Sequence, residues 1–428
     1  MPRRRDIAMK TLQGADQLLG LVVCSLLQPL RWLRVPNALG GRGHSHREVE
    51  RVLLIKFWGI GSLQLLTPAA RSLRRRRPQA RLTLLTLAEN ADFARGLGVF
   101  DEVKTLDVRG AGWLGVFVRI AALVSLLRGE RFDEVYDFEF FTRFSAVISI
   151  LSGAPTRAGF QSPSVWRGRL HTQTTTFNRY WHVARNFRAL AGGEDGHEVA
   201  HEDLVPFAVP GSVRQRLAGF LAERGAVREP LVVLNPNAGS LSLERRWPRD
   251  RFAQLAQTLI RESGAQVVLI GAPSEARYTG EIVELADLSE SESTALIDLS
   301  GGLDIAELCA LLERADTVVS NDSGPMHLAA VLGTPTIGLF GPETPVMYRP
   351  LGPRTLALWD PPICSPCINV HDNKLSNCIH GQPECLMNLS TESVLAATRR
   401  FLEGEVLQPV APPSKITPAK PKTHEHLG

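Results

Sequence analysis

Short, almost continuous apolar runs alternate along this chain with longer stretches whose apolar residues recur at helical spacing. The first run lies at residues 51–57 (RVLLIKF), and a second series opens at residues 231–236 (LVVLNP). Strands buried on both faces of a parallel sheet give such runs, and the helical stretches between them provide crossover connections. Further strands are predicted at residues 80–87, 103–106, 134–138, 266–271, 297–299, 317–320 and 336–340. The pattern predicts an α/β fold with two parallel sheets.

The two series of strands predict two doubly wound, Rossmann-like domains that face each other across a cleft. We expect the first domain at residues 50–210 and the second at residues 228–405. Ligands of such folds bind outside the carboxyl ends of the strands, so the functional site is expected between the domains. Residues 1–49 form a basic and apolar segment with a glycine-rich linker at residues 36–49, and the Pro- and Lys-rich residues 408–428 predict a disordered tail.

Composition and charge narrow the class of protein. A chain of 428 residues with 44% hydrophobic residues is long enough for two cores, and a net charge of +4 does not indicate nucleic-acid binding. Basic residues 3–5 precede an apolar run at residues 18–30, which is too short to span a bilayer about 30 Å thick. Arg31 and Arg34 follow where a signal peptide would need a cleavage site. We predict an interfacial helix on the cytoplasmic face of the inner membrane, and the alternative is a helix packed on the protein itself.

The stretch at residues 317–341 predicts a phosphate-binding turn between two strands. Backbone N–H groups around Gly324, at the start of a short helix, would point out of the carboxyl edge of the sheet together with the positive end of the helix dipole. Asp322 and Ser323 offer hydrogen bonds beside that position, and His327 lies in the first helical turn as a cation or an N–H donor. The alternative is an ordinary turn in which His327 caps or packs.

The order of these residues resembles a motif of a known family. Residues 320–330 (SNDSGPMHLAA), followed by residues 333–341 (GTPTIGLFG), look like the nucleotide-sugar motif of glycosyltransferase family 9, the ADP-heptose:lipopolysaccharide heptosyltransferases. The resemblance covers roughly residues 52–402 and implies a GT-B fold, with an acceptor-binding N-terminal half and a donor-binding C-terminal half. It also implies an inverting transfer, from ADP-heptose in the first instance, to lipopolysaccharide or another envelope glycan. The implied partners are a nucleotide-sugar donor and a glycan or lipid-linked acceptor, with no cofactor and no nucleic acid.

Two further features lie on the expected donor side. Asn237 lies in a loop after a predicted strand, at residues 235–240 (NPNAGS), which predicts a second phosphate-facing loop. Family 9 members usually carry Lys-x-Trp-Pro soon afterwards, and this chain resembles them with Arg245 at the place of the cation. A guanidinium can hold phosphate oxygens bidentately, although Arg245 and Arg246 would alternatively form a solvated pair. A diphosphate held by a helix start, Arg245 and His327 would need no metal, and no Asp-x-Asp motif of metal-dependent transferases is present.

The catalytic base departs from the family pattern. Gly61 and Ser62 follow the first predicted strand where the family usually has Gly-Asp, with the aspartate as general base. A serine cannot accept a proton at neutral pH without its own base, so Gly61 and Ser62 are placed only on the acceptor side. Asp137 and Glu139 alternate in an extended segment and share one face, and we predict one of them as the base. The alternative is that Glu139 pairs with Arg143 and only shapes the acceptor site.

Other interpretations stay open. His182 is a weaker candidate for the base and is expected to be structural or to bind ligand. The missing aspartate at Ser62 also suits a non-catalytic nucleotide-sugar-binding protein at the membrane, and the GT-B resemblance suits a nucleotide-sugar epimerase. A cluster of cysteines suggests either a structural zinc site or a reduced cluster that ties a loop. These cysteines are Cys364, Cys367, Cys378 and Cys385.

Overall fold

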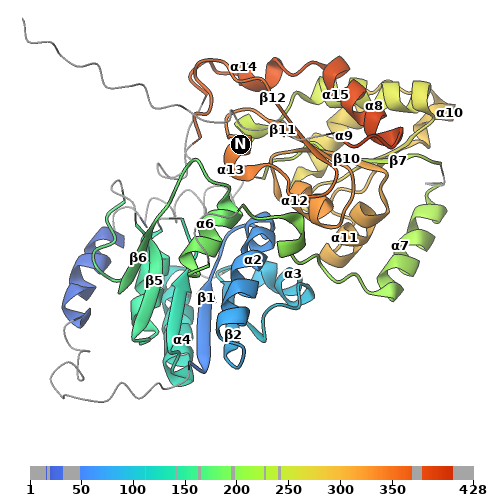
Figure 1. Ribbon diagram of the computed structural model, residues 1–428. Coiled ribbons are helices and arrows are strands. Elements are labelled where there is room, and N and C mark those ends of the chain that lie inside the picture. Colours follow the sequence, from blue (N-terminus) through green and yellow to red (C-terminus); the bar gives the residue numbers. More distant parts are fainter. Residues whose placement is uncertain are drawn as a thin grey trace, which may run out of the picture.

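Two α/β units, each built on a six-stranded parallel sheet, make up the computed structural model (Figure 1). The structure describes residues 16, 20–31, 49–110, 112–140, 142–161, 165–193, 198–225, 228–239, 242–368 and 378–407. The predicted linker up to residue 48 and the predicted tail at residues 408–428 lie outside the described residues.

The first sheet has the strand order β3-β2-β1-β4-β5-β6, and all its neighbouring strands run parallel. Its strands are β1 (Arg51–Ile55), β2 (Arg81–Leu87), β3 (Glu102–Leu106), β4 (Glu134–Asp137), β5 (Thr156–Gln161) and β6 (Gln173–Thr176). The helices around it are α2 (Ile60–Arg76), α3 (Ala91–Gly96), α4 (Trp113–Glu130), α5 (Arg143–Leu151) and α6 (Val183–Leu190), with short 3-10 helices η1 (Gln28–Arg31), η2 (Ala88–Asn90) and η3 (His201–Asp203).

The second sheet repeats this order as β12-β11-β10-β7-β8-β9, again entirely parallel. Its strands are β7 (Leu231–Asn235), β8 (Gln266–Leu269), β9 (Leu296–Asp298), β10 (Thr317–Asn321), β11 (Thr336–Phe340) and β12 (Thr355–Trp359). The helices are α7 (Gly211–Glu223), α8 (Arg249–Ser263), α9 (Ala276–Leu285), α10 (Glu290–Ser293), α11 (Ile305–Arg314), α12 (Gly324–Val331), α13 (Pro345–Tyr348), α14 (Glu384–Met387) and α15 (Thr391–Leu402), with η4 (Leu243–Arg245) and η5 (Pro273–Glu275). Both units thus have the doubly wound order in which the first and fourth strands are neighbours.

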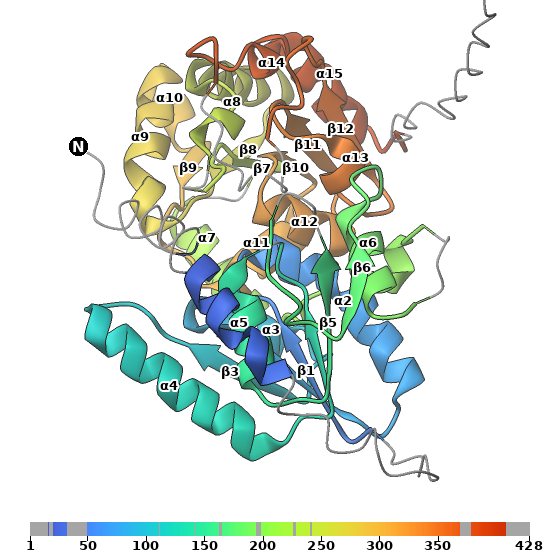
Figure 2. The same cartoon turned by 90° about the vertical axis from the view of Figure 1, so that its left-hand side faces the viewer.

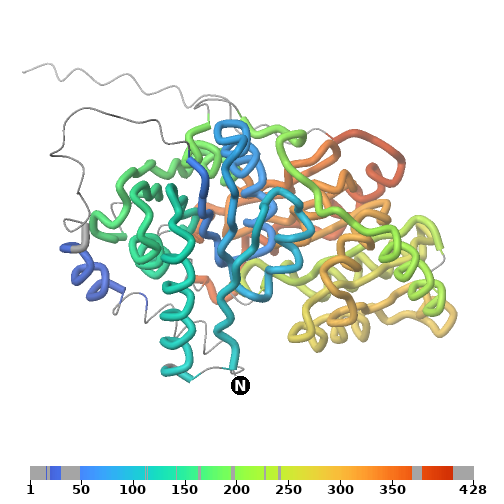
Figure 3. Tube along the Cα trace, turned by 90° about the horizontal axis from the view of Figure 1, so that it is seen from below, coloured from blue at the N-terminus to red at the C-terminus, as the bar shows by residue number. Residues whose placement is uncertain are grey.

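The alternation of side chains in β1 explains why helices cover both faces of the first sheet. Val52 and Leu54 point into the core that contains α2 and α6, whereas Leu53 and Ile55 point into the cluster that contains α4 and α5. Figures 2 and 3 show α4 and α5 on one side of this sheet and α2 on the other. All four side chains are therefore buried, as the continuous apolar run predicted.

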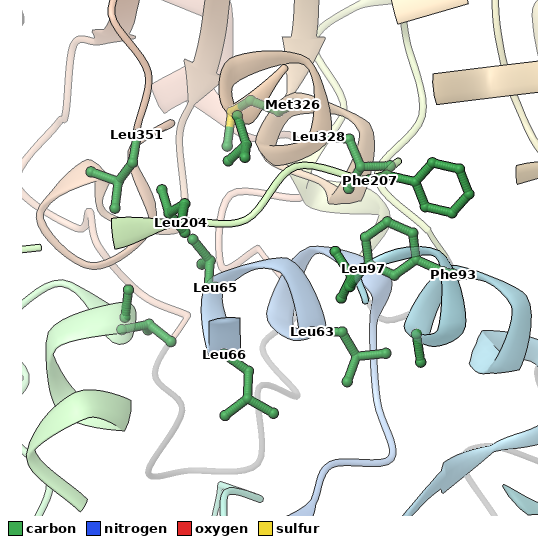
Figure 4. Packing of buried hydrophobic residues seen from close by; sticks show 14 of the residues in the cluster. Leu63, Leu65, Leu66, Phe93, Leu97, Leu204, Phe207, Met326, Leu328 and Leu351 are labelled. Carbon is green, nitrogen blue, oxygen red and sulfur yellow. The ribbon is translucent and has the colours of Figure 1, made fainter. Parts of the chain in front are cut away.

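Apolar side chains from both units pack together where the units meet. α2 contributes Leu65 to this shared core, and α12 contributes Met326 and Leu328 (Figure 4). The chain crosses from the first sheet to the second at residues 204–210, where the Phe207 ring stacks on Phe93 with 5.8 Å between ring centroids. The two strand edges that carry the candidate site are therefore held together by a continuous core.

The helix at residues 20–27 lies against α5. Cys24 is fully buried with Ala146 and Ile150 of α5, while other apolar side chains of the helix stay exposed. The alternative prediction, a helix packed on the protein, is thus confirmed for one face of this helix. None of the helices in the described ranges is both long and apolar enough to cross a membrane.

The predicted α/β fold with two parallel sheets is confirmed, and each of the nine predicted strands is present within one to two residues. Three strands were not predicted, namely β5, β6 and β12. β6 is a run of Gln and Thr residues on the sheet edge, mostly exposed, so it lacks the apolar signal of a buried strand. β5 is interrupted by Gly159, which lowers its strand signal.

Candidate functional site

The turn after β10 starts α12, as the sequence predicted. β10 ends at Asn321, Ser323 is the N-cap residue in an extended conformation, and α12 begins at Gly324. The first N–H groups of a helix have no partner within the helix, and they share the positive end of its dipole. This end of α12 can therefore bind an anion such as a phosphate.

A second helix start lies against the first. α2 follows Gly59, whose φ of 80° is in the region that favours glycine. A Cβ on Gly61 would lie 2.9 Å from Cδ2 of His327 and 3.0 Å from Cα of Gly324, and a Cβ on Gly324 would lie 2.7 Å from Cγ1 of Ile60. The two glycines thus allow close contact between the units. The positive ends of two helix dipoles meet at this point.

Arg245 joins the loops that follow β7 and β10. Its Nη1 donates to the carbonyl oxygen of Asp322 at 2.9 Å and lies 3.4 Å from Asp322 Oδ2, while Nη2 donates to the carbonyl oxygen of Ala238. Arg245 is therefore not a solvated cation, which rules out the alternative prediction for this residue. Asp322 is buried, and as a carboxylate it can only accept hydrogen bonds, which suits a sugar hydroxyl better than a phosphate.

Two asparagines after β7 fix the ends of the neighbouring strands. The Asn235 amide nitrogen lies 2.9 Å from Ser320 Oγ and 2.7 Å from Ser323 Oγ, so it donates to both sides of the α12 turn. The Asn237 amide nitrogen donates to the carbonyl oxygen of Ile270 at 3.0 Å, and its Oδ1 accepts from Arg246 at 3.3 Å. Asn237 thus holds the β7 and β8 ends together, and its predicted contact with the donor stays a prediction.

His327 is buried in the first turn of α12. Burial lowers its pKa to about 4, so the imidazole is neutral at pH 7. Its Nδ1 has no hydrogen-bond partner among the described residues. The sequence predicted His327 either as a cation or as an N–H donor. The neutral imidazole can offer a ligand an N–H donor but no positive charge. Ser323 precedes Gly324, and its hydroxyl oxygen accepts a hydrogen bond from the Asn235 amide.

Glu139 is buried directly behind the turn that starts α2. Its Oε1 accepts from Lys56 Nζ at 3.0 Å, from the backbone N–H of Trp58 at 3.1 Å, and from that of Phe57. Lys56 and Glu139 are 1% and 2% exposed, so they form a buried ion pair. The predicted alternative, a pair between Glu139 and Arg143, is wrong, because Lys56 occupies that carboxylate. Any proton that Glu139 accepts must go to Oε2.

Asp137 is the last residue of β4 and lies close to Glu139. Its Oδ2 accepts from Ser145 Oγ at 2.9 Å and lies 3.2 Å from Arg167 Nη1 and 3.1 Å from His171 Nε2. Burial raises the pKa of Asp137, but the hydrogen bond from His171 and the charge of Arg167 outweigh it and leave the pKa below its ordinary value. The strand prediction placed both carboxylates in one extended run, whereas β4 ends at Asp137 and the chain turns before Glu139. The Glu139 N–H donates to Asp137 Oδ1 at 3.1 Å, so Asp137 helps to fix the backbone of Glu139.

The remaining predicted residues of the acceptor side lie at different places. Ser62 is half-buried in the first turn of α2, next to Gly61. Arg143 starts α5, and its Nε donates to the carbonyl oxygen of Trp166 at 3.1 Å. The Arg143 N–H donates to the Asp16 carboxylate, so the backbone of Arg143 lies next to Asp16. Ser62 therefore borders the meeting point of the two helix starts, and the acceptor role of Arg143 stays a prediction.

His182 connects the two units. Its Nδ1 accepts from the Ala184 N–H at 3.2 Å and so caps α6, and its Nε2 lies 3.0 Å from the carbonyl oxygen of Arg349. Nε2 therefore carries the proton that is donated to Arg349. Burial lowers the pKa of His182 to about 3, so it stays neutral. Its structural role, expected from the sequence, agrees with this geometry.

None of the cysteines in the described ranges forms a disulfide bond, and the buried ones are Cys24, Cys309 and Cys385. Across the described ranges, no three His, Cys, Asp or Glu side chains lie close enough together to hold a metal ion. His371, which lies between Cys367 and Cys378 in the sequence, is outside the described residues. The zinc interpretation of the cysteine motif gains no support from the described part of the chain.

Several residues of the site have no signal in the sequence. Lys56 looks like part of an apolar strand, and its partner Glu139 is 83 residues away. Arg167 and His171 lie in a region without apolar periodicity, yet both are buried against Asp137. A charged residue inside an apolar run, such as Lys56 in RVLLIKF, is the one clue that a buried partner exists.

The chain is similar to one known protein family and to several of its members. The model of glycosyltransferase family 9 (heptosyltransferase) matches residues 120–377. Lipopolysaccharide heptosyltransferase 2 of Escherichia coli K12 is 24% identical over 359 residues, which cover 83% of this chain and 99% of the relative. Lipopolysaccharide heptosyltransferase 3 of the same strain is 23% identical over 353 residues, which cover 80% of this chain and 95% of the relative.

Solved structures show the same fold. The E. coli ADP-heptose lipopolysaccharide heptosyltransferase II has a TM-score of 0.64 at 21% identity and covers 83% of this chain and 99% of its own. The glycosyltransferase family 9 protein of Veillonella parvula has a TM-score of 0.65 at 21% identity and covers 84% and 99%. The predicted GT-B arrangement is thereby confirmed. Since the family match spans more than half of the chain, the protein belongs to glycosyltransferase family 9 and is a glycosyltransferase.

Proposed function

We propose that this enzyme transfers heptose from ADP-heptose to a growing lipopolysaccharide or another cell-envelope glycan, with inversion at the anomeric carbon. The observation that carries the proposal is the contact between the helix starts of α2 and α12 beside Arg245, in a chain of family 9. The names of the relatives support it, and so do the similar structures of E. coli heptosyltransferase WaaC with ADP and with ADP-2-deoxy-2-fluoro heptose.

The donor diphosphate would bind at the start of α12. Backbone N–H groups around Gly324 and the neutral His327 would donate hydrogen bonds to it, and Arg245 would supply the positive charge. These groups are fixed before the reaction, so they stabilise the charge that develops on the leaving ADP. Asp322 would accept from a hydroxyl of the sugar. The transfer would then proceed without a metal ion.

Glu139 would act as the base, with Asp137 as a positioning residue. The Glu139 carboxylate would take the proton from the acceptor hydroxyl while that oxygen attacks the anomeric carbon. The bond from the anomeric carbon to the phosphate oxygen breaks, and its electron pair leaves with ADP. Glu139 lies behind the turn before α2, whose Gly61 contacts α12, so acceptor and donor sides lie next to each other.

A lipid-linked acceptor would place the enzyme at a membrane. We expect the protein on the cytoplasmic face of the inner membrane, bound peripherally. The basic residues 3–5 and the apolar residues 18–30 support this expectation.

Turnover of ADP-heptose tests the proposal. The purified enzyme is incubated with ADP-heptose and truncated lipopolysaccharide, in EDTA, and released ADP and the anomeric configuration of the product are measured. We expect ADP release that depends on the acceptor and persists in EDTA, with an inverted anomeric centre. Absence of transfer to every truncated acceptor, or its loss in EDTA, would contradict the proposal.

A second function is suggested by two observations. Ser62 stands where the family usually has its base, and Glu139 Oε1 already accepts three hydrogen bonds. Both suit a protein that binds the nucleotide sugar without turning it over. Tight binding of ADP-heptose without ADP release, with any acceptor, would favour this second function.

A further inference from the structure

We propose that α4 and the helix at residues 20–27 form a face that lies on the surface of an anionic bilayer. The proposal rests on the proposed function only in that a lipid-linked acceptor gives this face its purpose. We call the exposed apolar side chains of the two helices the apolar face. Its members are Leu21, Val22, Val23, Leu26, Leu114, Phe117, Val118 and Leu126.

α4 is apolar on both of its sides. Leu123 and Leu127 point inward and pack on the first sheet in the core that contains α5. On the opposite side, Leu114, Phe117 and Val118 recur at helical spacing and are 79%, 64% and 60% exposed. A surface helix of a globular protein normally turns polar side chains outward. Figure 2 shows α4 at the edge of the first unit, with no described element over its outer side.

The helix at residues 20–27 extends the same layer. Its inner side chain Cys24 packs on α5, which also contacts α4. Its outer side presents Leu26, which is 72% exposed, together with Leu21 and Val22. In Figure 2 this helix, in dark blue, lies beside α5 on the side of the sheet that carries α4. Two neighbouring helices therefore expose apolar side chains on one side of the acceptor half, which indicates an interaction surface.

The distribution of charge identifies the occupant. Residues 1–35 contain six Lys and Arg and two Asp, a formal charge of +4, and the whole chain has 48 Lys and Arg and 44 Asp and Glu, also +4. The excess positive charge of the protein thus lies in the segment that carries the helix at residues 20–27. α4 adds Arg128, whose Nε donates to the carbonyl oxygen of Leu151, and Arg119, which lies 4.0 Å from the Asp107 carboxylate. Its one acidic residue, Glu130, is paired with Arg51 and Lys104.

Apolar side chains flanked by unbalanced positive charge suit anionic lipid headgroups. A second copy of this chain is a poorer occupant, because its own basic segment would face the same positive charge. α4 belongs to the unit predicted to bind the acceptor, and the helix at residues 20–27 packs on that unit, so docking would hold it next to lipid-linked glycans.

Vesicle sedimentation of the full-length protein tests the proposal, without any nucleotide or acceptor. The variant Phe117→Asp with Val118→Asp adds two negative charges to α4. The matched control, Val283→Asp with Leu285→Asp, adds them to exposed apolar positions of α9 in the other unit. We expect wild type and control to bind phosphatidylglycerol vesicles equally, and the α4 variant to lose at least tenfold in partitioning. Binding to vesicles of phosphatidylcholine alone should be much weaker.

Three results would overturn the proposal: no sedimentation of wild type with phosphatidylglycerol vesicles, equal binding by the α4 variant, or an equal loss in the control. Light scattering tests the other possible occupant, a second copy of this chain. If wild type is a dimer and the α4 variant is a monomer, this face is a dimer interface instead. ADP titration of the same samples separates the two proposals. Wild type that binds vesicles but not ADP contradicts the proposed function alone.

Discussion

At the scale of single residues, the centre of the acceptor half is a buried ion pair rather than an open carboxylate. Lys56 and Glu139 are almost completely buried, and Glu139 also holds the backbone of the turn before α2. Such a pair gives little net stability over an apolar pair, but loss of one partner leaves an uncompensated buried charge. The same carboxylate can therefore serve the fold and the reaction, and these two roles need separate tests.

Stability measurements address the structural role. Lys56→Met should lower the free energy of unfolding by about 3–5 kcal/mol, because Glu139 is then a buried charge without its cation. The double variant Lys56→Met with Glu139→Gln should recover most of this loss, since no charge remains buried. Urea unfolding of both variants and of Glu139→Gln completes the cycle. Simple addition of the two single losses would mean that the residues do not act as a pair.

Kinetics address the catalytic role. In the Lys56→Met background, Glu139→Gln should lower kcat at least about 100-fold, while the Kd for ADP stays the same, because a carboxamide cannot accept the proton. Using the stabilised double variant separates this effect from unfolding. Full turnover by that variant would remove Glu139 as the base.

The buried His327 predicts a dependence of stability on pH. In the unfolded chain its imidazole takes up a proton as the pH falls below about 6.5, whereas in the folded protein its pKa is lowered to about 4 by burial. The unfolded state therefore binds more protons between these values, so stability falls as the pH drops from about 6.5 to about 4.

Urea unfolding at pH 7 and at pH 4.5 gives the free energy of unfolding that each protein loses between these two values. We expect this loss to be smaller in His327→Gln than in wild type, by on the order of 2–3 kcal/mol. His182, whose pKa is lowered to about 3, contributes in the same direction in both proteins and cancels in the comparison. An identical loss in wild type and variant would show that His327 is not held in its neutral form.

At the scale of elements, the site depends on the contact between α2 and α12. Gly61 and Gly324 are the residues that let these helix starts approach, because either Cβ would come within 3.0 Å of an atom of the other unit. One of those atoms is the Gly324 Cα, which is backbone and cannot rotate away. Glycine is thus required at both positions for the starts of α2 and α12 to come this close.

Gly61→Ala should therefore push the two units apart. We expect a loss of about 1–3 kcal/mol in stability and weaker ADP binding, measured by urea unfolding and calorimetric titration. Gly219→Ala is the control, since Gly219 lies in α7 with open space around its Cβ position. It should be neutral or stabilising by up to about 1 kcal/mol, because alanine favours helix over glycine. Equal behaviour of the two variants would refute the close contact.

The elements also show what the sequence could predict. Buried strands and the β10–α12 turn were predictable, because continuous apolar runs, turn formers and an N-terminal proline depend on local sequence. The Lys56–Glu139 pair and the contact of Gly61 with His327 were not, because they join residues far apart in the chain. The extended run through Asp137 and Glu139 was predicted too long, since a strand pattern does not tell where the strand ends.

At the scale of the whole molecule, two units with the same strand order face each other through their strand ends. Arg245 and the α12 start belong to one unit, and Glu139 and the α2 start belong to the other. A donor bound to the second unit would thus meet an acceptor bound to the first. We therefore propose that the start of α12, beside Arg245, binds adenosine diphosphate.

Calorimetric titration with ADP, UDP and GDP in EDTA tests this claim most directly, on wild type, on Arg245→Gln and on the surface control Arg261→Gln. We expect ADP to bind wild type and the control without metal and in preference to UDP and GDP. Its affinity for Arg245→Gln should be at least tenfold lower. Absence of ADP binding, a preference for another nucleotide, or equal affinity of Arg245→Gln and wild type would contradict it.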